Sequence, residues 1–148
     1  LFSGLMVVAG KPYCLEYNVR FGDPETQSVV RRLGSGFAGA LKAVALGEAI
    51  PEIEVLDNAV TTVVLASGGY PGSEAKGKPI TIPSDLSEST VVFHAGTKSV
   101  DGQVVTNGGR VLGVSATADS LEESRSRAYA ASNRIEFEGK MMRTDIGL

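Results

Sequence analysis

The sequence lacks tryptophan, has one cysteine and one histidine, and contains no long apolar run. A single cysteine cannot form an internal disulfide, which is typical of a protein in a reducing compartment. One cysteine and one histidine also do not supply the ligands of a structural zinc site. The longest apolar stretches, residues 5–9 and 63–66, have the length of strands, whereas a membrane helix needs about 18 apolar residues. We therefore expect a cytoplasmic protein with no membrane partner.

The sequence also has no large excess of positive or negative charge. Its 14 lysines and arginines and 17 aspartates and glutamates give a net charge of −3. A protein that binds the phosphate backbone is usually basic, so no nucleic-acid partner is expected. The 43% hydrophobic and 21% charged content is that of a globular chain and excludes disorder. The sequence has no initiator Met and its first residues already have strand character, so we expect a piece of a longer protein, cut inside a domain.

The amino-terminal part alternates apolar and polar residues. Two β-rich runs, residues 5–9 and 13–19, flank the turn-forming residues 10–12 and predict a hairpin. In the second run, alternation places Glu16 and Asn18 on one face with Cys14 and Arg20. The strand therefore carries a row of polar groups on one side.

A helical pattern follows the hairpin. Asp23 is a suitable N-cap, Pro24 suits the first helical position, and Glu25 is favourable near the positive end of the helix dipole. Apolar residues then recur at helical spacing: Val29, Leu33, Phe37, Leu41 and Val44. We expect residues 34–36 (Gly-Ser-Gly) to break this stretch, Ser35 to cap a second helix, and Gly47 to end it.

The pattern changes near residue 59. Residues 48–58 contain Pro51 and several carboxylates and are expected to form a linker, which divides the chain into residues 1–58 and 59–148. Short strands are predicted at residues 60–66, 80–82, 91–94, 103–106 and 110–114, with a hairpin turn at Asp101-Gly102. Ser120 and Glu123 fit a capping box before a helix over residues 121–135. The expected second part is a small antiparallel sheet packed with one long helix, so the fold class is α+β.

Glu16 and Asn18 are the first candidate site. Side chains two residues apart on a strand leave the same face, roughly 7 Å apart at the backbone. A carboxylate and an amide oxygen suit Mg²⁺, which takes few protein ligands and completes its shell with phosphate and water. Arg20 continues this face and could hold a phosphate or carboxylate with its planar fork. The alternative is a solvated strand face with no ligand, because Glu-x-Asn is a common pattern.

Four other features carry weaker signals. Residues 22–25 open the predicted helix and could bind an anion there, or Asp23 simply caps it. Residues 72–78 have the spacing of a phosphate-binding loop, but Pro79 and a β-like run follow, so a turn before a strand is predicted. His94 is expected to be a hydrogen-bonded core or interface residue. Residues 106–110 are expected to form a hairpin turn, with an anion contact through Arg110 as the alternative.

Several runs resemble the phosphoribosylamine–glycine ligase (glycinamide ribonucleotide synthetase) family of the ATP-grasp superfamily. The most specific is Glu16-Tyr17-Asn18-Val19-Arg20-Phe21-Gly22-Asp23-Pro24-Glu25-Thr26-Gln27. Further similar runs cover residues 64–72, 92–97, 105–114, 137–139 and 143–147, in the family's order. The resemblance implies that residues 1–58 end an ATP-grasp domain, as a β-hairpin plus helix, and that residues 59–148 form the C-terminal domain.

The resemblance also implies a reaction. An ATP- and Mg²⁺- (or Mn²⁺-) dependent ligase of purine biosynthesis joins glycine to 5-phosphoribosylamine through glycyl phosphate, giving glycinamide ribonucleotide. Matched position by position, Glu16 and Asn18 would bind the metal and Arg20 would be catalytic. Asp23 and Glu25 would contact substrate or cap the helix. Because the ATP-clamping part is not among the 148 residues, this chain alone is expected to be inactive.

Two alternatives stay open at the level of sequence. Another ATP-grasp ligase or carboxylase would share the Glu-x-Asn-x-Arg pattern, although the Gly-Asp-Pro-Glu continuation argues against it. A non-catalytic interaction module would keep the fold while Glu16 and Asn18 had no role with metal and nucleotide. Mutation of Glu16 in the longer protein separates these classes.

Overall fold

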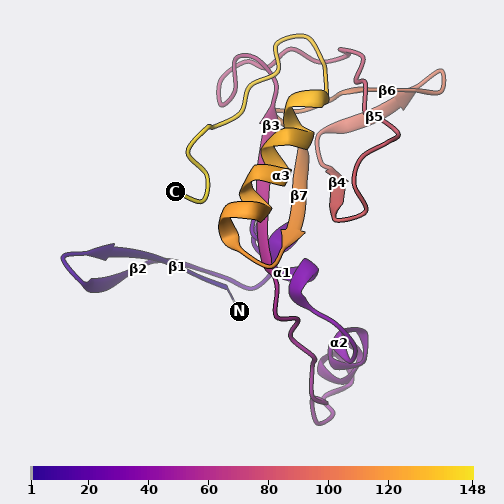
Figure 1. The fold of residues 1–148 in the computed structure, drawn as a ribbon. Helices are drawn as coiled ribbons and strands as arrows, with labels where there is room; N and C mark the ends of the chain where they lie inside the picture. Colours follow the sequence, from indigo (N-terminus) through magenta and orange to yellow (C-terminus); the bar gives the residue numbers. More distant parts are fainter. Residues whose placement is uncertain (1) are drawn as a thin grey trace.

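The computed structural model describes residues 2–148 as a mixed α/β fold with small antiparallel sheets (Figure 1). Its elements are β1 (Phe2–Val8), β2 (Lys11–Asn18), α1 (Thr26–Val29), the 3₁₀ turn η1 (Val30–Arg32), α2 (Phe37–Leu46), β3 (Ala59–Ala66), β4 (Thr90–His94), β5 (Thr97–Val100), β6 (Gln103–Thr106), β7 (Arg110–Ala118) and α3 (Leu121–Arg134). The strands form a three-stranded sheet, β3-β7-β4, and two pairs, β1-β2 and β5-β6. Within the described residues, no helix is long and apolar enough to cross a membrane.

The core lies between α3 and one face of the β3-β7-β4 sheet. Val63 of β3 pairs with Val114 of β7, and Leu65 pairs with Leu112, so four large apolar side chains meet in a row. These side chains and Ile135 are 0–1% exposed. Ala128 and Ala131 of α3 are also buried, and their small side chains allow the helix to lie close to the sheet. The predicted sheet with one long helix is therefore confirmed.

The cap of α3 is also confirmed. Ser120 occupies the N-cap position with extended backbone, and its Oγ accepts a hydrogen bond from the backbone N–H of Glu123 at 3.2 Å. The reciprocal half of the capping box is replaced, because the carboxylate of Glu123 pairs with Arg127 one turn further along the helix. The helix ends one residue earlier than predicted, at Arg134.

The opposite face of the sheet is covered in part by α1 and η1. Successive residues of β3 point to opposite faces. The hydroxyl of Thr61 contacts Ser124 of α3 at 2.8 Å, whereas that of Thr62 contacts Ser28 of α1 at 2.7 Å. In η1, Nη2 of Arg31 donates to the carbonyl of Ser89 at 2.8 Å. Residues 26–32 are thus a second layer on the sheet.

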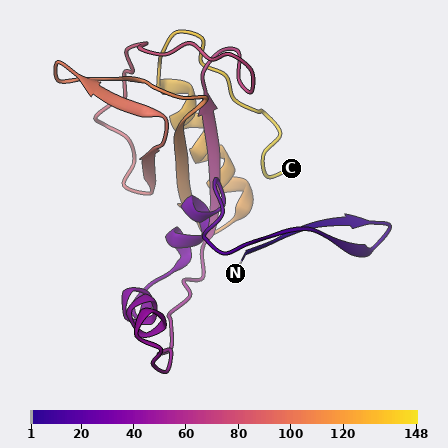
Figure 2. The ribbon, with the colours of Figure 1, turned by 180° about the vertical axis from the view of Figure 1, so that it is seen from behind.

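The β1-β2 hairpin extends away from the rest of the molecule (Figure 1 and Figure 2). Its turn is the two residues Ala9 and Gly10, with φ of 49° and 77°. Positive φ at both central residues matches the twist of two-residue hairpins. The predicted hairpin is confirmed, but its turn lies at residues 9–10 and not 10–12, because Lys11 and Pro12 belong to β2, with Pro12 opposite Val7.

The predicted break at residues 34–36 and the second helix after it are confirmed, but the first helix is shorter than expected from Asp23. α1 has four residues and starts at Thr26, and α2 has ten. Ser35 does not cap α2, because its backbone N–H and hydroxyl both donate to the Glu54 carboxylate, at 3.0 and 2.9 Å. Gly36 takes the N-cap position with φ of 86°, where a Cβ would lie 2.4 Å from the Glu52 carbonyl oxygen. The end of α2 at Gly47 is confirmed.

The break at residues 34–36 also changes which side chains of α2 are covered. Leu41 and Val44, members of the predicted apolar stripe, are 45% and 61% exposed. Ala40 and Ala43 are the buried residues of this helix instead. The predicted stripe is therefore wrong within α2, where the two alanines are covered in place of the larger apolar side chains.

The segment 48–58 has no helix or strand but is attached along its second half. It runs antiparallel to residues 32–35, with a bridge between Leu33 and Val55. The backbone N–H of Leu56 donates to Arg32 at 2.8 Å, and that of Glu54 donates to Ser35 at 3.0 Å. The predicted linker is therefore held against the residues just before α2.

Around the sheet, two smaller predictions are wrong and one is confirmed. Residues 80–82 do not form a strand, because Ile80 bonds to Val104 of β6 while Thr81 bonds to Glu136 after α3, so no continuous ladder forms. Residues 106–110 are not a hairpin turn, since β6 pairs with β5, a strand that the sequence analysis missed. The Asp101-Gly102 turn between them is confirmed, with φ of 49° and 81°.

His94 also differs in part from its prediction. Its Nδ1 lies 3.1 Å from the Thr97 hydroxyl at the end of β4, so the ring is hydrogen-bonded as expected. The residue is exposed and is therefore not part of the core.

Candidate functional site

Glu16 and Asn18 lie on one face of β2, as their spacing predicts. Nδ2 of Asn18 donates to Oε1 of Glu16 at 3.0 Å, so the two side chains touch. Gly4 of β1 pairs with Glu16 across the hairpin, and a Cβ there would lie 3.2 Å from Cγ of Glu16. The glycine thus leaves room for the carboxylate to lie along the strand pair.

This pair offers oxygen ligands to a hard cation. The contact with Asn18 uses one carboxylate oxygen of Glu16, so the second carboxylate oxygen and the amide oxygen can turn toward an ion. Over residues 2–148, no group of three or more His, Cys, Asp or Glu side chains is arranged to hold a metal. A two-ligand site fits Mg²⁺, which keeps water and phosphate oxygens in most of its positions. The donor set therefore fits a magnesium ion that is shared with a phosphate ligand.

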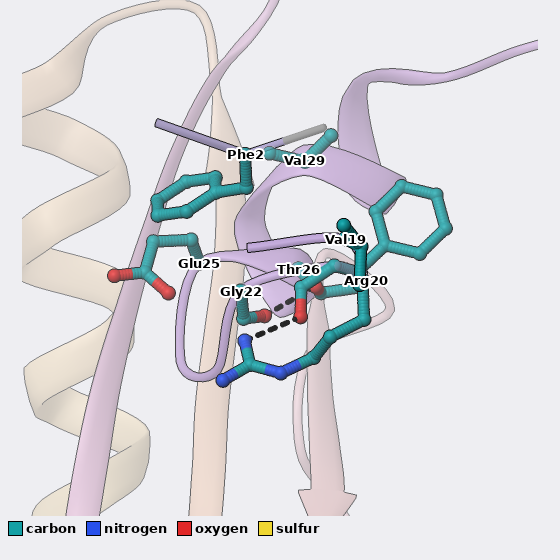
Figure 3. A pocket seen from close by; sticks show the side chains of 8 residues that line it. Phe2, Val19, Arg20, Gly22, Glu25, Thr26 and Val29 are labelled. Carbon is teal, nitrogen blue, oxygen red and sulfur yellow. Dashed lines mark hydrogen bonds between the residues drawn. The ribbon is translucent and has the colours of Figure 1, made fainter. Parts of the chain in front are cut away.

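A pocket of about 440 Å³ lies just after β2 and is bordered by both ends of the turn at residues 22–25, which we call the signature turn. Its lining comes from both sides of that turn: Phe2, Val19, Arg20, Phe21, Gly22, Glu25, Thr26 and Val29. Figure 3 shows Arg20 folding beneath Gly22, with Phe2 above the same turn. Nη1 of Arg20 donates to the Phe21 carbonyl at 2.9 Å, which leaves other guanidinium N–H groups for an anionic ligand.

Gly22 and Glu25 shape this pocket together. The carbonyl of Gly22 accepts the first hydrogen bond of α1, from the Thr26 N–H at 3.0 Å. A Cβ on Gly22 would lie 2.4 Å from Oε2 of Glu25, so the glycine makes space for that carboxylate. Glu25 occupies the N-cap position of α1 but its side chain caps nothing. Its carboxylate therefore lies beside Gly22 without bonding to the helix backbone, and Glu25 borders the pocket.

Asp23 points elsewhere. Its Oδ1 accepts a hydrogen bond from Nε2 of Gln27 at 3.2 Å, and its Oδ2 lies 3.2 Å from Nη2 of Arg110. The Asp23 carbonyl accepts a second bond from Arg110, at 2.8 Å from Nη1. The prediction that Asp23 caps the helix is wrong, because its carboxylate is engaged by these two side chains and the helix starts at Thr26.

The structure thus sorts the predicted residues into three sets. Arg20 and Glu25 line one pocket, Glu16 and Asn18 touch on the strand before it, and Asp23 is bonded to Gln27 of α1 and Arg110 of β7. The sequence predicted a possible anion contact for Arg110, but it indicated neither Arg110 nor Gln27 as a partner of Asp23. Arg110 is 87 positions from Asp23, and neither periodicity nor a short motif connects residues so far apart.

The profile of the family described as phosphoribosylglycinamide synthetase, C domain, matches residues 60–148, which is more than half of the chain. The chain belongs to this family, which confirms the resemblance predicted from the sequence.

The relatives carry a more specific name. The phosphoribosylamine–glycine ligase of Agrobacterium fabrum is 47% identical over 147 residues, and that of Thermotoga maritima is 45% identical over 148 residues. The crystal structure of the Thermotoga maritima ligase superposes with a TM-score of 0.84 at 43% identity, over 97% of this chain. The chain spans about a third of the length of these relatives, namely 35–36%.

Proposed function

We propose that this chain is the C-terminal part of a phosphoribosylamine–glycine ligase of purine biosynthesis. The longer enzyme would use ATP to join glycine to 5-phosphoribosylamine, giving glycinamide ribonucleotide, ADP and phosphate by way of glycyl phosphate. The observation that carries the proposal is similarity to ligases of this name along 99% of the chain, at 45–47% identity. We further propose that residues 1–58 end an ATP-grasp domain, and that the protein works in the cytoplasm without nucleic acid or membrane.

Glu16 and Asn18 are the proposed metal ligands. Their contact at 3.0 Å brings a carboxylate and an amide onto one face of an exposed strand, which is the geometry such a pair needs. A bound Mg²⁺ (or Mn²⁺) would supply neutralisation of the charge on the ATP phosphates. The two side chains would hold the metal ion beside the nucleotide, and in this way would fix the direction from which the phosphate chain approaches.

Arg20 is the proposed catalytic residue. It lines the same pocket as Glu25, and its planar guanidinium can pair with two oxygens of a phosphate or acyl phosphate. A fixed cation stabilises charge that develops on the transferring group more than charge in the ground state, which lowers the barrier. Glu25 would bind the substrate amine or orient glycine, because its carboxylate is free of the helix backbone and borders the pocket.

The test is Glu16→Gln in the full-length ligase that contains this chain. The substitution keeps the size of the side chain and removes its charge, so we expect turnover to fall on the order of 100-fold and Mn²⁺ affinity in the presence of ATP to fall as well. Phosphate release and the electron paramagnetic resonance signal of Mn²⁺ measure the two effects. The matched control is Glu88→Gln, an exposed glutamate on the loop before β4.

Other outcomes distinguish the alternatives. Unchanged turnover and unchanged Mn²⁺ binding in Glu16→Gln would contradict the metal role and favour a non-catalytic module. Turnover with other amine or carboxylate substrates, but not with glycine and phosphoribosylamine, would favour another ligase of the same superfamily. Mass spectrometry of the product separates these two cases.

A further inference from the structure

We propose that Arg110 of β7 is a positioning residue, which holds the signature turn on the sheet and thereby sets the placement of Arg20 and Glu25. The inference rests on the proposed function and extends it to a residue far from the ligand-binding motif. It means that a residue of the β3-β7-β4 sheet directly positions the residues of the site.

The contact between Arg110 and Asp23 fixes both the main chain and the side chain of the turn. Nη1 donates to the Asp23 carbonyl at 2.8 Å, and Nη2 lies 3.2 Å from Oδ2 of the same residue. Two nitrogens of one planar guanidinium therefore hold one residue at two points, which restricts rotation as well as translation. The short, single ammonium group of a lysine cannot span both acceptors in this way.

Arg110 is itself held in place from the sheet side. It begins β7, the central strand, and its carbonyl accepts hydrogen bonds from the Gly96 N–H at 2.8 Å. The preceding Gly109 lies against the ring of Tyr70, and a Cβ there would lie 2.2 Å from the ring carbon Cδ2. The base of the Arg110 side chain is therefore anchored by close backbone packing, which is what a positioning residue requires.

The far side of Asp23 is held by α1. Nε2 of Gln27 donates to Oδ1 of Asp23 at 3.2 Å, while the Gln27 side chain lies over Gly113, where a Cβ would be 3.6 Å from its Cγ. Gly113 is in β7, three residues after Arg110. One strand thus contacts the turn twice, directly through Arg110 and through Gln27 packed over Gly113.

The consequence for the site follows from the short chain distance. Gly22 and Glu25 flank the held Asp23 and line the pocket, and Arg20 is three residues before it. Release of Asp23 would let the turn shift relative to the sheet. A displacement of about 1 Å at a site of group transfer can lower turnover by as much as 100-fold.

The first readout is structural and does not depend on catalysis. In Arg110→Met we expect the amides of Thr26 and Val29, bonded to the carbonyls of Gly22 and Glu25, to exchange with deuterium about 10-fold faster. The amide of Val63 in the core should not change. The control is Arg143→Met, which removes an arginine paired with Asp145 in the C-terminal tail at 2.6 Å.

The second readout is kinetic, in the full-length ligase. Arg110→Met should lower kcat about 10-fold or more while leaving KM for ATP nearly unchanged, Arg110→Lys should restore part of the loss, and Arg143→Met should have no effect. Adding Asp23→Asn to Arg110→Met should lower kcat little further, because both changes release the same turn.

Either readout can overturn the proposal. Unchanged exchange at Thr26 and Val29 would mean that Arg110 does not hold the turn. Faster exchange with unchanged kcat would mean that the contact is merely structural, and multiplicative losses in the double variant would make Asp23 a substrate ligand in its own right. If instead the Glu16→Gln test fails, the ligase assignment is lost while the exchange result stands, so the two failures are distinguishable.

Discussion

Residues 2–58 and residues 59–148 differ in where their apolar side chains lie. In the second region, Leu65 and Leu112 are 0–1% exposed beneath α3, whereas in the first region Leu15 is 65% exposed and Val19 is 95% exposed. A two-stranded hairpin alone is marginally stable in water. The second region therefore contains its own core, and the first region depends on surfaces that it contacts.

Several polar contacts join the two regions. They include Ser28 with Thr62 and Arg31 with Ser89, in addition to the Asp23–Arg110 pair. The exposed apolar side chains of the first region, such as Leu15 and Val19, mark a surface that binds another surface. The proposed metal ligands Glu16 and Asn18 therefore lie in the region without a core of its own, while Arg110, which holds Asp23, lies in the region that has one.

The largest expected effect is the loss of a buried leucine in the second region. Leu112→Ala removes a side chain packed in the core cluster and should lower the free energy of unfolding by about 2–5 kcal/mol. Leu15→Ala, on the exposed hairpin, should change it by less than about 0.5 kcal/mol. Urea unfolding followed by circular dichroism measures both. Equal losses of unfolding free energy for the two variants would contradict the view that only the second region contains a buried core.

The next effect concerns two glycines that contact different kinds of atoms. A Cβ on Gly96 would lie 2.7 Å from the Arg110 carbonyl oxygen and 2.8 Å from Cα of Gly108, both of them backbone atoms. Gly96→Ala should therefore lower the free energy of unfolding by about 1–3 kcal/mol.

Gly34 of the first region provides the comparison. A Cβ there would meet the Glu54 carboxylate at 2.5 Å, but that group ends a flexible side chain and can move away. Gly34→Ala should cost less than about 1 kcal/mol, and thermal unfolding of both variants by calorimetry tests the difference. A larger loss in Gly34→Ala would contradict the view that the second region is the more tightly packed.

The difference between the regions also explains how well the sequence predicted each of them. In the second region the Asp101-Gly102 turn, the Ser120 cap and the apolar side of α3 come from local chemistry together with one buried face, so pattern and structure agree. Residues 80–82 have the composition of a strand, but their hydrogen bonds go to two different partners. Which partner a backbone group finds is decided by the tertiary fold and not by the local sequence.

In the first region, local signals were overridden by partners distant in the chain. Ser35 has the chemistry of a cap, yet Glu54 takes both of its donors, and Asp23 is taken by Arg110. The same-face arrangement of Glu16 and Asn18 was predictable because it needs only the period of a strand. The anchor at Arg110 was not, because it depends on which strand lies under the signature turn.

The serines before α2 and α3 should give a smaller difference in unfolding free energy between the two regions. Ser120→Ala removes the bond to the Glu123 N–H and should lower the free energy of unfolding by about 1 kcal/mol. Ser35→Ala removes no cap and should cost only a few tenths of a kcal/mol at an exposed position. Guanidinium unfolding of the two serine variants measures the difference. A larger loss for Ser35→Ala would mean that the Glu54 contact matters more than the cap of α3.

The smallest effect is the response of that Glu54 contact to acid. Two hydrogen bonds to its carboxylate lower the pKa of Glu54 below its ordinary value of 4.5. The larger effect comes from the Ser35 backbone N–H and the smaller one from the Ser35 hydroxyl. A carboxylate with a lowered pKa stabilises the fold above its unfolded pKa, and loses that contribution as the pH falls through the lower, folded value. Nuclear magnetic resonance should therefore record a shift of the Ser35 amide only below about pH 4.5. Glu54→Gln should abolish this titration, and Glu52→Gln should preserve it. A Ser35 amide that titrates equally in the unmodified protein and in both variants would mean that the Glu54 carboxylate does not bond to residues 34–36.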